Sequence, residues 1–341
     1  MFVLLGTGLD ALRGHRRLSL AGLFAREGPV LVETGSGEHP ARLRVGVIGP
    51  GRAGTALARA LAHAGHRVVA AHAISEDSVR RVRDNFRHAR LALPEQVIAD
   101  VDLVLLTVPD DDLPGLVRGL AETGAPLAGR MLVHASGRFG VRVLDPAARQ
   151  GALPMALHPV MTFAGREDDL DRIKGTCFGV TAPEPLRAVA EVLVIEMGGE
   201  PVFIEEESRP LYHAALEFAV NHVAAVVAES ADLLGQACAG PPGADSGAGQ
   251  SGAVPPGRML GPLLAATLDN AVRLGDAALT GPVVRGDAQC VAADAAALAA
   301  ASPAAQRAYL ALARLAAGRA LAAGLLRTAD AERLIDVLGD Q

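Results

Sequence analysis

A glycine-rich turn between an apolar run and a helical pattern constrains this chain more than any other feature. Residues 43–54 read LRVGVIGPGRAG, and the helix-favouring stretch 55–62 follows at once. The first glycine of the GxGxxG pattern allows a tight turn, the second lets backbone approach a pyrophosphate, and the third permits close helix–strand packing. Free N–H groups at the helix start would receive the phosphates. The residues predicted to contact a dinucleotide here are Gly49, Gly51, Arg52, Ala53 and Gly54.

Strand-like and helical patterns alternate after this motif. Apolar runs typical of buried parallel strands lie at 67–73, 102–108, 130–134, 154–157 and 176–181. Helical patterns lie at 54–64, 78–86, 113–123 and 184–197, and beyond residue 203 at 208–238, 259–279, 287–301, 303–323 and 329–338. The sequence therefore predicts an α/β fold, with a doubly wound parallel Rossmann sheet followed by an all-α second domain.

The expected domain boundaries follow from these patterns. Residues 1–41 lack periodicity and are expected to form a poorly ordered extension, and residues 42–204 to form the nucleotide-binding domain. Residues 205–341 are expected to form a helical domain for substrate binding and dimerisation, interrupted by a flexible Pro/Gly/Ser loop at 241–257.

Composition excludes several classes of partner. The net charge of −6 argues against nucleic acid and membrane surfaces. The three cysteines are widely spaced and form no zinc or disulfide pattern, so no metal is expected and a cytoplasmic location is the default. No run approaches the ~20 apolar residues of a transmembrane helix. Helices rich in Ala and Leu, with 3% aromatic residues in the chain, favour a homodimer that buries further apolar surface.

The end of the second predicted strand bears on the choice of cofactor. NAD sites usually place an acidic residue there to bind the ribose 2′-hydroxyl. Here Ser75 is followed by Glu76, Arg80 and Arg81. Serine and nearby arginines suit a 2′-phosphate, so NADP is favoured, while Glu76 leaves NAD as the alternative. The loop after 102–108 should also border the cofactor, through Val108 and Pro109.

Polar residues follow two further predicted strands. His134, Ser136 and Gly137 come after one, and His158 ends the next. Because ligands bind beyond the carboxyl ends of strands in such sheets, these residues are predicted to contact substrate, with Ser136 orienting a reacting carbonyl. The alternative is that His134 and His158 are buried core residues with no role in binding or catalysis.

Two groups in the helical domain complete the candidate site. His213, Glu217 and Asn221 are four residues apart and share one face of an apolar helix, so one of them could donate a proton. The turn 279–287 offers Thr280, Gly281 and Arg285 for a substrate carboxylate. The alternative for the helix is that His213, Glu217 and Asn221 make packing contacts. The alternative for the turn is that Arg285 lies in solvent.

Several separated motifs resemble those of one bacterial family. The segments GPGRAGTALA, HASG, ALHPVMTF, YHAALEFAVNH and LTGPVVRGD resemble a family with a Rossmann-like domain followed by a helical domain of unknown function. That family is similar to ketopantoate reductase, 6-phosphogluconate dehydrogenase and pyrroline-5-carboxylate reductase. The resemblance implies that His213 stands where ketopantoate reductases carry a lysine.

The resulting expectation is an NADP-dependent oxidoreductase that reduces a small 2-keto acid, with ketopantoate to pantoate as the leading reaction. His213 is the expected proton donor, because an imidazole can act as a general acid near neutral pH. The alternatives are an imine reductase of the pyrroline-5-carboxylate type, a prephenate-type dehydrogenase, and a sensor that binds NADP without turnover.

Overall fold

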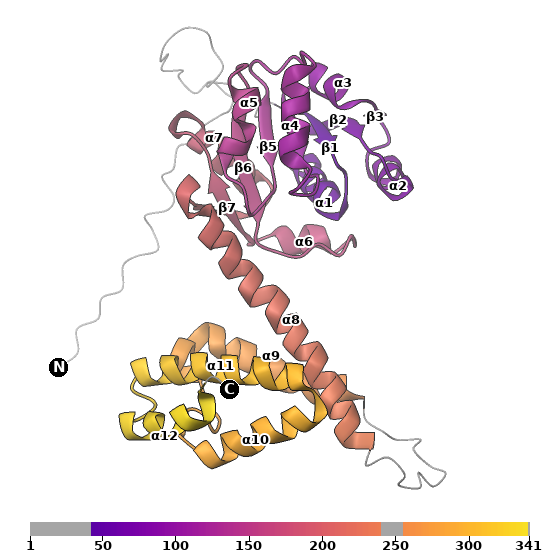
Figure 1. Ribbon diagram of the computed structural model, residues 1–341. Coiled ribbons are helices and arrows are strands. Elements are labelled where there is room, and N and C mark those ends of the chain that lie inside the picture. The colour runs from indigo at the N-terminus through magenta and orange to yellow at the C-terminus, as the bar shows by residue number, and fades with distance from the viewer. Residues whose placement is uncertain (1–41, 240–254, 340–341) are drawn as a thin grey trace, which may run out of the picture. The chain divides into compact units, whose positions relative to one another are not determined.

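The computed structural model describes residues 42–239 and 255–339, which form two units (Figure 1). The units divide inside one helix, between Leu216 and Glu217. The extension expected over 1–41 and most of the loop expected over 241–257 lie outside the described residues.

The first unit is built on one eight-stranded sheet with the order β3-β2-β1-β4-β5-β6-β7-β8. The first six strands pair in parallel, and their order is that of doubly wound dinucleotide-binding sheets, which confirms the predicted fold. The strands are β1 (Arg44–Ile48), β2 (Arg67–His72), β3 (Arg90–Leu91), β4 (Leu103–Leu106), β5 (Met131–His134), β6 (Leu153–Pro159), β7 (Cys177–Thr181) and β8 (Glu200–Phe203).

Helices cover both faces of this sheet, which is why the strands read as continuous apolar runs. Leu57 of α1 and Leu193 of α7 belong to one buried cluster, and Val97 of α3 and Val117 of α4 belong to another. The helices of this unit are α1 (Arg52–His63), α2 (Glu76–Asn85), α3 (Pro94–Ala99), α4 (Leu113–Glu122), α5 (Asp145–Ala148), α6 (Asp169–Ile173) and α7 (Arg187–Glu196).

The seventh strand corrects the sequence prediction. The run 176–181 was expected to be parallel to its neighbour, but β7 pairs with β6 in the antiparallel sense. Parallel neighbours are usually joined by a helix that crosses over the sheet; the segment between β6 and β7 is long enough for such a crossover, but its helix, α6, has only five residues. β8, which the sequence patterns did not predict, pairs in parallel with β7, and α7 lies between the two along the chain.

The second unit is helical, as predicted. Its helices are the later part of α8 (Arg209–Ala239), then α9 (Pro256–Leu274), α10 (Ala288–Ala301), α11 (Pro303–Ala322) and α12 (Thr328–Leu338). The side chain of Asp287 accepts a hydrogen bond from the Cys290 N–H at the start of α10, and Ser302 caps α11 in the same way. The end of the predicted loop is wrong, because Pro256 already opens α9, a position that suits a residue without an N–H.

Candidate functional site

The glycine turn has the geometry that dinucleotide binding needs. Gly49 has a φ of 85°, a conformation that favours glycine, and its carbonyl accepts a 2.8 Å hydrogen bond from the Thr107 hydroxyl. A Cβ on Gly54 would collide with Thr107, so the third glycine allows α1 to lie against the end of β4. A Cβ on Gly51 would come no nearer than 3.9 Å to another heavy atom, so space is open there for a ligand. The turn therefore fits a pyrophosphate.

The remaining predicted cofactor residues surround this turn. Arg52 is exposed and Ala53 half-buried in the first turn of α1. A methyl carbon of Val108 would lie 2.9 Å from a Cβ on Gly49, so the loop after β4 borders the turn, and the Pro109 carbonyl accepts from the Leu113 N–H as α4 begins. These positions agree with the expectation that ligands bind beyond the carboxyl ends of the strands.

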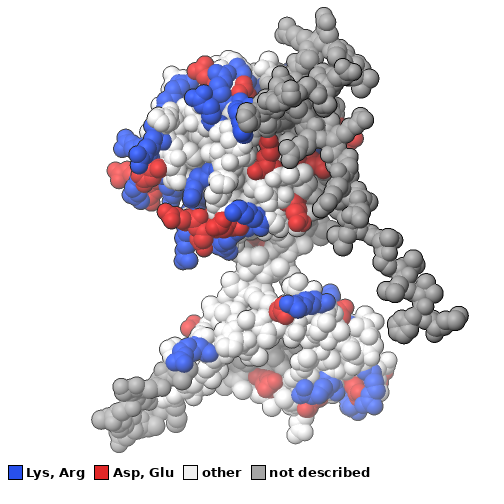
Figure 2. Space-filling view, turned by 180° about the vertical axis from the view of Figure 1, so that it is seen from behind, with Lys and Arg blue, Asp and Glu red and all other residues white. Residues whose placement is uncertain are grey.

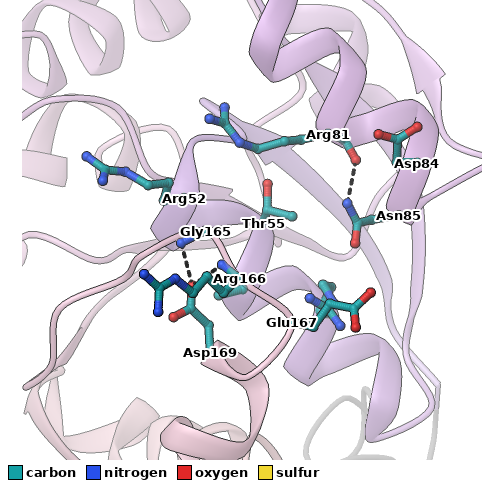
Figure 3. A pocket seen from close by; sticks show the side chains of 11 residues that line it. Arg52, Thr55, Arg81, Asp84, Asn85, Gly165, Arg166, Glu167 and Asp169 are labelled. Carbon is teal, nitrogen blue, oxygen red and sulfur yellow. Dashed lines mark hydrogen bonds between the residues drawn. The ribbon is translucent and has the colours of Figure 1, made fainter.

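Some polar side chains after β2 already have partners within the protein, which the sequence pattern did not indicate. Ser75 is the N-cap of α2, and its hydroxyl oxygen accepts from the Ser78 N–H and lies 2.9 Å from the Ser78 hydroxyl. Arg80 is paired with Asp77, whereas Arg81 lines a pocket beside α1 (Figure 3). Of the two arginines, Arg81 is therefore the one without an ion pair inside the described chain.

His134 is held by backbone groups on both sides of its ring. Its Nδ1 accepts from the Ser136 N–H at 3.2 Å, so Nε2 carries the proton and donates to the Gly140 carbonyl at 2.8 Å. Burial lowers the pKa of His134 to about 4, and the ring is fully buried. Ser136 in turn accepts from the N–H groups of Arg138 and Phe139, which leaves its own O–H free to donate. His134 thus shapes the loop that carries Ser136.

His158, at the end of β6, forms the most distinctive contact of the site. Its Nδ1 lies 2.7 Å from the hydroxyl of Tyr212 on α8, and the two rings meet edge to face. A Cβ on Gly137 would lie 2.9 Å from His158 Nε2, so glycine at 137 gives this nitrogen its space. Burial, reinforced by the charges of Arg209 and His213, lowers the pKa of His158 to about 4. The imidazole is therefore neutral at pH 7.

Arg209 supports this pair from the core of the first unit. It is 1% exposed and donates to the Thr181 hydroxyl at 2.8 Å and to the Gly179 carbonyl at 2.9 Å. Its guanidinium also lies over the Tyr212 ring, at 5.4 Å from the centroid. Burial raises the pKa of the Tyr212 phenol, so the hydroxyl keeps its proton and donates to the neutral imidazole.

Sequence reasoning missed both Arg209 and Tyr212. One signal was present for each. Arg209 opens a helix, where the macrodipole disfavours a cation, and Tyr212 is one of two tyrosines in the chain.

The three residues predicted to share a helix face lie on both sides of the boundary between units. His213 is half-buried in the first unit, close enough to His158 to affect the pKa of that ring. Glu217 and Asn221 are exposed in the second unit, where the Asn221 amide donates to the Glu217 carboxylate. The structure therefore brings His213, but not the other two, into the cluster around His158.

The predicted carboxylate turn lies in the second unit. Gly281 has a φ of 96°, and its carbonyl accepts from the Arg285 N–H at 3.2 Å. Thr280 and the Arg285 side chain are exposed. The assignment of Thr280, Gly281 and Arg285 to substrate binding stays a prediction. No group of three or more His, Cys, Asp or Glu that could hold a metal occurs within residues 42–239 and 255–339.

Comparison with known proteins agrees with this architecture. A glycerol-3-phosphate dehydrogenase [NAD(P)+] from Bradyrhizobium sp. (strain ORS 278) is 30% identical over 169 residues, or 45% of this chain, and the chain spans about half the length of that relative. A protein of Bacteroides fragilis provisionally described as an NADP oxidoreductase is 24% identical, with a TM-score of 0.63 over 81% of this chain and 98% of that one.

A reductive aminase from Aspergillus terreus, solved with NADPH and ethyl levulinate, shares the fold at 18% identity. Its TM-score is 0.57, and the match covers 87% of this chain and 99% of that one. Residues 30–159 match the Rossmann-like domain, and residues 176–316 match a domain of unknown function, DUF2520. The two matched segments follow one another in the order that the sequence motifs indicated.

Proposed function

We propose that this chain is an NADP-dependent reductase of a small 2-keto acid, with ketopantoate to pantoate as the leading reaction. The observation that carries the proposal is the hydrogen-bonded pair of His158 and Tyr212 beside Ser136 and Gly137, at the carboxyl ends of β5 and β6. The glycine turn follows β1 at the same edge of the sheet. The NAD(P)-dependent dehydrogenase and the NADPH-bound aminase among its relatives support the choice of cofactor.

Reduction of a keto group needs a hydride at carbon and a proton at oxygen. The bound nicotinamide would supply the hydride. The Ser136 hydroxyl is free to donate a hydrogen bond to the carbonyl oxygen and so polarise it. His158 Nε2–H then gives its proton to the alkoxide, while the Tyr212 hydroxyl passes its proton to Nδ1. The buried cation of Arg209 stabilises the phenolate that this transfer leaves.

His213 remains the second candidate for the proton donor. It lies within electrostatic reach of His158, and no residue on the described part of α8 is a lysine. A proton moved by His213 would not depend on the Tyr212 hydroxyl. The two candidates therefore predict different effects of replacing Tyr212 and of replacing His213.

The test follows NADPH oxidation with ketopantoate, pyruvate, 2-oxoisovalerate and pyrroline-5-carboxylate in parallel. Tyr212→Phe and His158→Asn should each lower kcat by roughly 10²–10⁴ with the preferred keto acid, the usual contribution of a general acid. His213→Ala should leave kcat within a few-fold of the wild type. The reverse pattern would make His213 the donor and would overturn the role given to Tyr212.

The substrate panel also separates the alternatives. Turnover confined to the cyclic imine would replace the keto-acid assignment by imine reduction, the reaction class nearest to that of the reductive aminase. NADPH binding without oxidation of any substrate would favour a sensor. In the keto-acid case, Thr280, Gly281 and Arg285 are proposed to bind the substrate carboxylate.

We also propose a homodimer that covers α8. The segment Glu206–Ala239 has a mean hydropathy of 1.3 over its most apolar 18 residues, and none of that window is buried. Its large apolar side chains point in several directions around the helix, with exposed fractions of 55% for Phe218, 50% for Val220, 40% for Val223 and 42% for Val226. A helix that is apolar all round needs cover.

We expect the second unit of another copy of the chain to cover α8. On the face seen in Figure 2, its charged side chains form small groups, and broad areas carry none. Contrary to the expectation from the sequence, this helix is long and apolar enough to cross a membrane by length and composition alone, so the measurement must separate the two cases. Light scattering at micromolar concentration without detergent should give the mass of a dimer. A monomer, or protein recovered only with lipid, would contradict the proposal.

A further inference from the structure

The pocket that Arg81 lines is a polar recess beside the glycine turn, between α1, α2 and the loop before α6. Its volume is about 270 Å³, slightly below the range of pockets that hold whole drug-sized ligands. A single phosphorylated fragment would fill it. It is lined by Arg52, Thr55, Ala56, Arg59, Arg81, Asp84, Asn85, Gly165, Arg166, Glu167 and Asp169 (Figure 3).

The recess holds four arginines whose guanidinium groups are not neutralised by direct contact. None of the side chains of Arg52, Arg59, Arg81 and Arg166 forms an ion pair or hydrogen bond within the described residues. In the view of Figure 3 the guanidinium groups of Arg52, Arg81 and Arg166 lie on one side, and the carboxylates of Asp84 and Glu167 point to the other. The arginine side therefore carries an excess of positive charge, although the Asp169 carboxylate also lies there.

The wall that carries Arg166 is fixed rather than loose. Asp169 is 1% exposed, and its carboxylate accepts from the N–H groups of Ala164, Gly165 and Arg166 at 3.2, 2.7 and 3.2 Å. Gly165 has a φ of 75°, and a Cβ there would lie 3.0 Å from the Arg52 side chain. The loop is thus folded against Arg52. The Asp169 carboxylate is bonded to backbone N–H groups and lies 3.9 Å from the Arg172 guanidinium, and it forms no ion pair with the four arginines that line the recess.

We propose that this recess binds a phosphate monoester, held by Arg52, Arg81 and Arg166 with Arg59 alongside. The planar guanidinium matches phosphate oxygens with two parallel hydrogen bonds, and several such groups converge here. The phosphate has two possible sources, the 2′-phosphate of NADP or a separate phosphorylated small molecule. The first source rests on the proposed function; the second does not.

The experiment uses the full chain and two variants of the recess, Arg81→Gln and Arg166→Gln. Arg80→Gln is the matched control, because Arg80 is the preceding residue of the same helix but pairs with Asp77 outside the recess. Inorganic phosphate is titrated by calorimetry at low ionic strength, without cofactor, and circular dichroism checks that each variant is folded. Each recess variant should weaken phosphate binding about tenfold or more, the usual worth of a hydrogen bond to a charged group, while the control stays within twofold.

Titrations with NADPH and NADH distinguish the two sources. If the 2′-phosphate occupies the recess, Arg81→Gln weakens NADPH about tenfold and leaves NADH unchanged. If a separate ligand occupies it, both cofactors bind Arg81→Gln as they bind the wild type, and phosphate still binds when NADPH is saturating. The proposal would be overturned if phosphate did not bind, or bound equally to the wild type and the three variants, and the affinity for NADPH were also unchanged. A failure of NADPH oxidation would refute the proposed reaction and leave the phosphate measurement standing.

Discussion

Two neutral histidines in the first unit should make its stability depend steeply on pH. The pKa values of His134 and His158 are both about 4, against about 6.5 for histidine in an unfolded chain. Below pH 6.5 the unfolded chain binds protons at these positions and the folded chain does not, so stability falls as the pH falls. Between pH 7 and pH 5 each histidine should cost about 2 kcal/mol of the free energy of unfolding. The loss ends near pH 4, where the folded protein is protonated too.

The variant that isolates this effect is His134→Gln, because the glutamine amide can still donate toward the Gly140 carbonyl but does not titrate. Its free energy of unfolding in urea, measured by circular dichroism at pH 7 and pH 5, should fall by about 2 kcal/mol less than that of the wild type. His88→Gln, at an exposed position, serves as the control for loss of any histidine. Equal losses in wild type and His134→Gln would refute the assignment of a neutral buried ring.

Further predictions concern the cofactor, the substrate and the assembly. Gly51→Asp should abolish NADPH binding in a fluorescence titration and leave the circular dichroism spectrum unchanged, because the new side chain would fill the open space and repel phosphate. Arg285→Ala should raise KM for the keto acid and change kcat little, because the lost contact binds the ground state and the transition state equally; a fall in kcat alone would contradict this role. Val220→Glu should shift the light-scattering mass toward a monomer, because it buries a charge in the proposed interface, and an unchanged dimer would remove α8 from it.

The nucleotide-binding half was largely predictable from the sequence, because each of its signals is local. The strand, the glycine spacing and the helix of residues 43–63 lie within one short segment, and all three formed as expected. The reversal at β7 was not predictable from apolar content, since a buried strand reads alike in either direction. The signal for the reversal lay in the segment before β7, where α6 is only five residues long.

The site was predictable only in part, because its parts come from distant segments. Strand-end placement identified Ser136, Gly137 and His158, but the partner of His158 lies 54 residues further along the chain. Nothing local to Tyr212 shows that its hydroxyl meets an imidazole. His134 has the same strand-end position as His158, yet its ring is taken up by backbone groups, which sequence spacing cannot reveal.

The contact between Gly54 and Thr107 has an evolutionary consequence. A Cβ at position 54 would meet both the Thr107 side chain and the Gly49 carbonyl, and Thr107 itself donates to that carbonyl. Neither position can change size alone without moving the turn. Among natural relatives, alanine at 54 should therefore occur together with a smaller residue at 107, and an aligned set of sequences should show the two positions changing as a pair.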